Sequence, residues 1–227
     1  MIVTFLAAVS AKLCNAKEAS LPAEKKHMST RHKLCEYGTG IPSILTILFG
    51  AAYGSVNTFI AMMASEVGIE NAGLFFIVGT IFVFISRLFG GRIFDSKGGF
   101  WVILPGGILY LIGLGILVSA QSLTVLLVAS VFYGFGGGLL LPSLMTWMLN
   151  VVTPDRRSGA SATFYNMLDI GTSSGIILLG SVAGSIGYVN MYYYVIGVMV
   201  IFIAFFMFNH FVLQKKVKKQ NEQEELA

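Results

Sequence analysis

Six long apolar runs, separated by short polar connections, constrain this chain more than any other feature. They cover residues 41–63, 72–89, 100–118, 123–152, 160–187 and 191–213. A helix needs ~20 residues to cross ~30 Å of hydrocarbon, and the runs are close to that length or longer. The second run is short, and we expect it to borrow residues on either side. The pattern predicts an all-α fold, a polytopic membrane protein built as a bundle of six transmembrane helices.

The composition agrees with a lipid environment. Only 11% of the 227 residues are charged, and 56% are hydrophobic. A water-soluble domain of this length has too much surface to cover with so few charges. The net charge of +4 could suit an anionic partner such as nucleic acid. The placement of the charges indicates the lipid bilayer as the partner instead, and no nucleic acid.

The lysine and arginine residues avoid every second connection between the runs. All 15 of them fall within residues 12–33, 87–97, 156–157 and 215–219. The alternate connections, residues 64–71, 119–122 and 188–190, contain none. Basic residues collect on the cytoplasmic side of membranes, so both termini are predicted to be cytoplasmic and the number of crossings to be even. We expect a multi-pass protein of a bacterial-type plasma membrane.

The N-terminal residues 1–11 are apolar but too short to cross a membrane. They could be a secretory signal, since residues 8–11 resemble a cleavage site, but no basic residue precedes them. We interpret them as the remnant of a preceding membrane helix. Residues 12–36 are then a polar cytoplasmic linker, 37–214 the six-helix transmembrane bundle and 215–227 a charged cytoplasmic tail. Cys14 and Cys35 show no metal-ligand spacing, and we predict neither a metal site nor a cofactor.

Two motifs carry a resemblance to a known family. The connection after the second run reads GRIFDSKGG, in which Gly91, Asp95 and Gly98 match the signature loop of the major facilitator superfamily in register. Ser96 and Gly99 depart from it, because the family usually has basic residues there. Residues 154–160, which read PDRRSGA, resemble the segment before the family's eleventh helix.

The resemblance covers residues 36–213 and implies the C-terminal six-helix half of a secondary active transporter, with a drug-efflux-like subfamily among those it allows. It also implies a cytoplasmic gating loop that docks against the other half. The residues assigned to this gate are Gly91, Arg92, Asp95, Gly98, Arg156 and Arg157. From the residues alone, Gly91 and Gly98 are expected to form a tight turn, and the Asp95 carboxylate can accept hydrogen bonds from a helix N-terminus. An ordinary solvated turn is the alternative.

The fifth run contains the most informative polar residues. Thr163, Asn166, Asp169 and Ser173 recur every three to four positions, which predicts one helix face. Asp169 is the only acidic residue well inside a run, and a charge in hydrocarbon costs several kcal/mol. It is either a proton-coupling or substrate-contacting carboxylate, or a residue near the membrane surface that pairs with Arg156 or Arg92.

Further polar and aromatic residues lie in the first and fourth runs. The candidates for the substrate and proton pathway there are Tyr53, Asn57 and Tyr133. Such residues suit a cavity for a partly apolar ligand, although helix packing uses the same types. Glycine pairs such as Gly171 and Gly175 are expected to serve close helix packing.

These features predict transmembrane transport of a small molecule by alternating access, as proton-coupled efflux (antiport) of an amphipathic or drug-like compound. No enzyme is predicted, because the three histidines lie outside or at the rim of the runs and Asp169 has no catalytic companion. An isolated half would expose its polar face to lipid, so a second six-helix half is expected, either a separate chain or a homodimer partner. Alternatives are an organic-anion exchanger or uptake half, and a truncated fragment without independent activity. No basic residue lies inside a run except Arg87 near an end, which favours neutral or cationic substrates.

Overall fold

The computed structural model describes the backbone of residues 39–224 and the side chains of residues 39–211. It contains six α-helices, all long and apolar enough to cross a membrane, and no strand in the described part. The helices are α2 (Gly40–Glu66), α3 (Gly73–Lys97), α4 (Phe100–Val118), α5 (Leu123–Asn150), α6 (Arg157–Ile186) and α7 (Tyr188–Glu224), and a 3₁₀ turn, η2 (Pro154–Arg156), precedes α6. The predicted fold class is confirmed. The predicted helix remnant and linker, and the side chains of the tail, lie outside the described residues.

Helix α3 is longer than its apolar run. The run ends at Phe89, whereas the helix continues to Lys97 and ends at Gly98, which has φ +87° and donates its N–H to the Phe94 carbonyl at 2.9 Å. Hydropathy marks where a helix leaves the lipid, but its hydrogen bonds continue as long as the backbone allows. The expected turn at Gly91 was therefore wrong, because this glycine lies inside α3.

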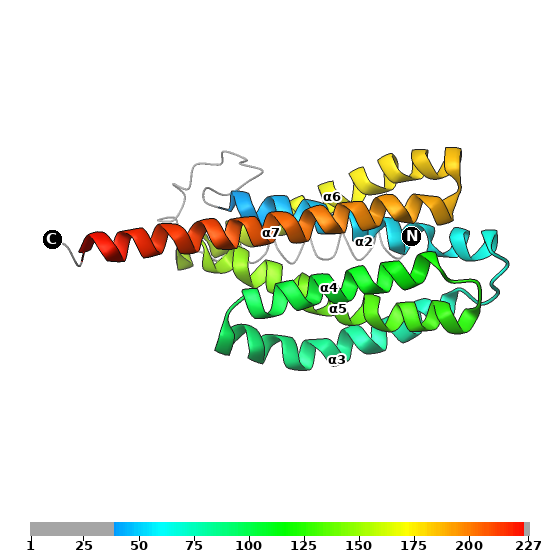
Figure 1. Cartoon of the computed structure of the whole chain (residues 1–227), viewed down its shortest axis with the longest axis horizontal. Coiled ribbons are helices and arrows are strands. Elements are labelled where there is room, and N and C mark those ends of the chain that lie inside the picture. Colours follow the sequence, from blue (N-terminus) through cyan, green and yellow to red (C-terminus); the bar gives the residue numbers. More distant parts are fainter. Residues whose placement is uncertain (1–38, 225–227) are drawn as a thin grey trace, which may run out of the picture. The chain divides into compact units, whose positions relative to one another are not determined.

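Helices α2 and α5 form the centre of the bundle. Helix α6 packs on α2, α3 packs on α5, and α4 and α7 pack on each other and on the central pair. Figure 1 shows α3 and α6 at opposite edges, with the other helices between them. Of the spans, α3 and α6 are the least buried, with 22% and 28% of their apolar windows inside the bundle. Their outer surfaces are therefore free to meet lipid or another protein.

A row of small residues holds α2 and α6 together. A Cβ placed on Gly175 would lie 2.5 Å from the Ala51 carbonyl oxygen, and one on Gly171 would collide with the backbone of Ile47. Across the same seam, the Thr172 hydroxyl donates to the Gly50 carbonyl at 3.3 Å. Backbones can approach this closely only where side chains are absent, so the packing role predicted for these two glycines is confirmed.

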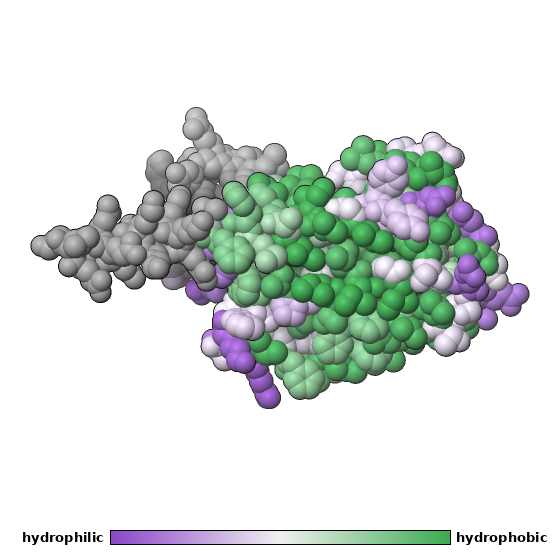
Figure 2. Space-filling view, viewed as in Figure 1, coloured by the Kyte–Doolittle hydropathy of each residue, from purple (hydrophilic) through white to green (hydrophobic). Residues whose placement is uncertain are grey.

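The glycines of α5 allow close packing against two neighbouring helices. Gly134 and Gly138 face α3, where a Cβ on Gly134 would meet the backbone of Gly79. Gly136, between them, faces α4, and a Cβ there would lie 2.5 Å from the Tyr110 amide nitrogen. Alternate glycines therefore let α5 pack closely against α3 and α4 at once. The exposed surface over the middle of the helices is largely apolar, with hydrophilic residues toward the helix ends (Figure 2), as a membrane protein requires.

Candidate functional site

A polar stripe on the outer side of α6 is the first part of the site. Asn166, Asp169 and Ser173 are all exposed there, and at 100° per residue they fall within about 60° of one another. Thr163 lies apart from them. It is 2% exposed, and its hydroxyl donates to the Gly159 carbonyl at 2.9 Å. The structure thus brings together three of the four residues that the spacing placed on one face.

The depth of Asp169 distinguishes between its two interpretations. Helix α6 begins at Arg157, so Asp169 lies about 18 Å along the helix axis from that end, near the middle of the span. Arg156 lies one residue further away, in η2. That separation exceeds the combined reach of the two side chains. The structure therefore places the carboxylate twelve residues into α6, too far from Arg156 to pair with it, and no ion pair joins Asp169 to Arg92 among the described side chains.

A second polar group lies inside the bundle. The Asn57 side-chain amide donates to the Tyr133 hydroxyl at 2.9 Å and to the Tyr53 carbonyl at 2.7 Å. Tyr133 is 7% exposed, and its ring packs on Tyr110 with the centroids 4.9 Å apart. Two residues of the predicted pathway are thus in contact. They join α2 to α5 within the packed core.

Two tyrosines of this core were missed by the sequence reasoning. Tyr110 on α4 and Tyr192 on α7 are fully buried. Phe49 of α2 packs against the Tyr110 ring at 5.5 Å, edge to face. Tyr110 lies in the third apolar run and Tyr192 in the sixth. The signal that could have found Tyr110 is its place as the single tyrosine between the glycines of the third run, since a small-residue surface leaves space for one large ring.

The predicted gating residues gather at one end of the bundle, where α3 ends and α6 begins. Gly91, Arg92 and Asp95 are exposed on the last turns of α3, and Arg156 and Arg157 are exposed where η2 leads into α6. Gly98 ends α3 in the left-handed region, which favours glycine. The residues therefore form two groups at the same end of the bundle, one at the end of α3 and one at the start of α6.

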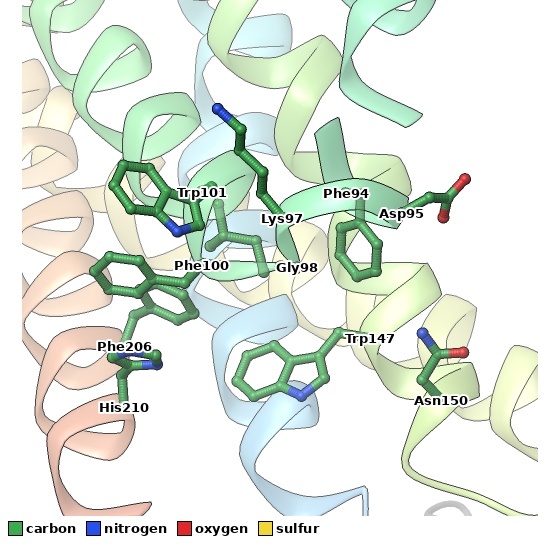
Figure 3. Close-up of a pocket in the computed structure, with 12 residues that line it drawn as sticks. Phe94, Asp95, Lys97, Gly98, Phe100, Trp101, Trp147, Asn150, Phe206 and His210 are labelled. Carbon is green, nitrogen blue, oxygen red and sulfur yellow. The ribbon is translucent and has the colours of Figure 1, made fainter. Parts of the chain in front are cut away.

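A cavity of about 820 Å³ adjoins the end of α3. Its wall is mainly aromatic, because the Phe100 ring stacks on His210 at 4.1 Å and on Phe206 at 5.9 Å. Figure 3 shows the Asp95 carboxylate pointing away from this aromatic group. The cavity is thus lined mainly by aromatic and apolar side chains, together with Asp95, Lys97 and His210.

Six spanning helices with a polar stripe at mid-depth define a polytopic membrane protein of the transporter class. The sequence model of the Major Facilitator Superfamily matches residues 43–227, and the chain belongs to this superfamily. Its members are transporters, not enzymes.

Individual relatives agree with this assignment. The chain is 26% identical to the proton-coupled antiporter flippase LtaA of Staphylococcus saprophyticus, over 83% of this chain and 46% of that protein. It is 26% identical to the staphylopine export protein of Staphylococcus aureus, over 73% of this chain and 42% of that protein. The chain therefore spans about half the length of the curated relatives it matches.

Solved structures show the same fold. The chain resembles a peptide transporter POT in complex with alafosfalin, with a TM-score of 0.65, 18% identity and coverage of 75% of this chain and 38% of that one. It also resembles an auto-inhibited POT family peptide transporter, with a TM-score of 0.66, 16% identity and coverage of 77% and 37%.

Proposed function

We propose that this chain acts as one six-helix half of a proton-coupled antiporter that exports an amphipathic or drug-like compound by alternating access. The observation that carries the proposal is the Asn166–Asp169–Ser173 stripe, exposed at mid-depth on an edge helix. A carboxylate facing lipid at this depth costs several kcal/mol, so a position on a water-filled pathway is favoured. There Asp169 can take up the coupling proton or hold a cationic group of the substrate.

The relatives support the transport class and the coupling ion. One is named as a proton-coupled antiporter flippase, and the other as an export protein. The first name states proton coupling and antiport, and the second states export. Export coupled to H⁺ is therefore the form of transport that we propose for this chain.

A second six-helix half completes the proposed transporter. Alternating access moves one half against the other around a site between them. In that arrangement the polar stripe faces the other half, and Asn57 with Tyr133 holds α2 and α5 in register behind it. Gly91, Arg92, Asp95, Gly98, Arg156 and Arg157 form the cytoplasmic gate. The basic residues on alternate connections support a bacterial-type plasma membrane location with both termini in the cytoplasm.

Arg87 favours a second candidate, exchange or uptake of an organic anion. The apolar run placed Arg87 near an end, but α3 continues to Lys97, so Arg87 lies about 15 Å along the helix from that end. An exposed guanidinium at this depth suits a carboxylate or phosphate group of a substrate. The two candidates differ in the charge of the compound that is carried.

Inside-out vesicles from a host that expresses the chain test the proposal. We expect ethidium, an amphipathic cation, to accumulate when the vesicle interior is acidified, and Asp169→Asn to abolish this accumulation. Asp155→Asn is the matched control, because Asp155 is exposed in η2 at the cytoplasmic surface. Wild-type accumulation by Asp169→Asn, or equal signals with and without the chain, would contradict the proposal. Uptake of fluorescein that Arg87→Gln abolishes would favour the anion candidate.

A further inference from the structure

Two opposite charges lie well inside the long helices at the two edges of the bundle. Arg87 on α3 is about 15 Å from the cytoplasmic end of its helix, and Asp169 on α6 is about 18 Å from the cytoplasmic end of its own. Among the side chains that the structure describes, no other Asp, Glu, Lys or Arg lies more than about 10 Å along a helix from its nearer end. Both are exposed, and neither forms an ion pair with another described residue.

The two charges turn to the same side of the bundle. Viewed from the external end, Arg87 lies roughly 80° clockwise from the residues of α3 that contact α5, such as Val83 and Ser86. Asp169 lies roughly 110° anticlockwise from the residues of α6 that contact α2, such as Gly171. Because α3 and α6 are at opposite edges (Figure 1), these opposite rotations bring both side chains to one face.

We propose that the second half is a second copy of this chain, related by a twofold axis along the membrane normal, and that Arg87 of each copy pairs with Asp169 of the other. The inference rests on the proposed function, in which another six-helix half faces the polar stripe. In a twofold interface, a residue at one edge meets the residue at the opposite edge of the partner. A base at one edge and an acid at the other therefore close two identical ion pairs.

The orientation of the axis follows from the charge pattern. An axis in the membrane plane would invert one copy and put its basic connections outside, against the positive-inside rule. A rotation about the membrane normal leaves every residue at its own height. Because Arg87 and Asp169 lie at similar distances from the same end of the bundle, Arg87 of one copy can meet Asp169 of the other. Arg–carboxylate pairs are commonly bidentate, and pairing removes two charges that would each be costly in lipid.

The ion pair also links the dimer to transport. Uptake of a proton by Asp169, or arrival of a cationic substrate, neutralises the charge that holds Arg87 of the other copy. The pair then opens, and the two copies are free to rock about the site. Asp169 is therefore both a residue of the dimer contact and the proposed coupling carboxylate.

Disulfide cross-linking between copies tests the pairing. Cys14 and Cys35 are first replaced by serine, and two differently tagged chains are co-expressed, one with Arg87→Cys and one with Asp169→Cys. We expect oxidation in the membrane to join the two tags, and each variant expressed alone to give no cross-link, since like edges do not meet. Leu88→Cys with Asp169→Cys is the matched control, because Leu88 is exposed at the same depth but about 100° around α3.

Charge reversal provides an independent measurement. Arg87→Asp or Asp169→Arg alone should weaken dimer association in detergent at least tenfold, and the double exchange should restore it. If the chain transports ethidium but the two tagged chains form no cross-link, the homodimer is overturned and the proposed function stands. The same holds if the chain pairs one to one with a different protein. A dimer that forms the cross-link while the chain with native Arg87 and Asp169 gives no accumulation in vesicles would instead remove the proposed function and leave the dimer.

Discussion

The Asn57 side chain on α2 donates a hydrogen bond of 2.9 Å to the Tyr133 hydroxyl on α5 and so ties together the two central helices of the bundle. The Tyr133 ring packs among other rings, with its centroid 5.2 Å from that of Phe75 and 4.9 Å from that of Tyr110. Water has little access to this position, because Tyr133 is buried. Loss of the amide would leave the hydroxyl without this partner in an apolar setting.

Replacing Asn57 by alanine should therefore destabilise the folded bundle. Hydrogen bonds between membrane helices contribute about 0.6 to 1.7 kcal/mol, and we expect a loss in that range. Unfolding of the purified protein in mixed micelles of detergent and denaturant measures it. Thr58→Ala is the control, because Thr58 is the next residue and is exposed. Equal stability of the two variants would show that the interhelical bond contributes nothing.

The seam between α2 and α6 gives a second prediction. In Gly175→Ala the added Cβ would lie 2.5 Å from the Ala51 carbonyl, so the helices must separate. We expect a cost of about 1–3 kcal/mol, as for other overpacked contacts. Gly184→Ala is the matched variant on the same helix, where a Cβ meets nothing within 4 Å. It should be neutral or slightly stabilising, since alanine favours helix. Thermal unfolding of the two variants measures this difference in stability.

The end of the bundle where α6 leads into α7 contains a capping contact. The Glu66 carboxylate at the end of α2 accepts the Tyr188 N–H at 2.6 Å, at the N-terminus of α7. A carboxylate there is stabilised by the partial positive charge of the helix end, worth about 0.3–1 kcal/mol. Glu66→Gln should lower the stability by this amount, most clearly at low salt. Glu70→Gln, exposed in the nearby connection, should not. A matching loss in Glu70→Gln would contradict the capping role.

The sequence predicted the six helices because a helix that crosses a lipid core must be a long apolar segment, and the chain contains six such segments. It did not predict the last turns of α3, where Arg92 and Asp95 lower the hydropathy while the backbone stays helical. Arg87 is two residues from the end of its apolar run but ten residues from the end of α3 for the same reason. Hydropathy indicates which residues prefer lipid to water, whereas the ends of a helix are set by its backbone hydrogen bonds.

The site was accessible to sequence reasoning only in part. Spacing placed Asn166, Asp169 and Ser173 on one face, but Thr163 lies at the edge of that face and is covered by neighbouring helices. A helical period describes directions around one axis and says nothing of what packs there. The contact between Asn57 and Tyr133 joins residues far apart in the chain, so it depends on packing that no local pattern encodes.

The corrected end of α3 leads to a prediction that compares two glycines of one motif. Gly98 has φ +87° and ψ 168°, a region that residues with a side chain rarely enter. Gly98→Ala should therefore cost about 1–3 kcal/mol. Gly91→Ala should be neutral or stabilising, because Gly91 is helical and a Cβ there meets nothing within 4 Å. Denaturation of the two variants measures the difference. If Gly91→Ala were the more damaging, α3 would have to end earlier than the structure shows.

Membrane topology gives the last prediction. Six crossings with the basic residues on alternate connections require the turn at residues 67–72 to face outward and residues 215–227 to face the cytoplasm. In a chain with Cys14 and Cys35 replaced by serine, Glu70→Cys should react in intact cells with a maleimide that cannot cross the membrane. A cysteine in place of Gln220 should react only after the cells are opened. Cells opened before labelling provide the control for both positions, because each cysteine must then react. Labelling of both positions from the same side would contradict an even number of crossings, and with it the pairing of α3 and α6 at a common depth.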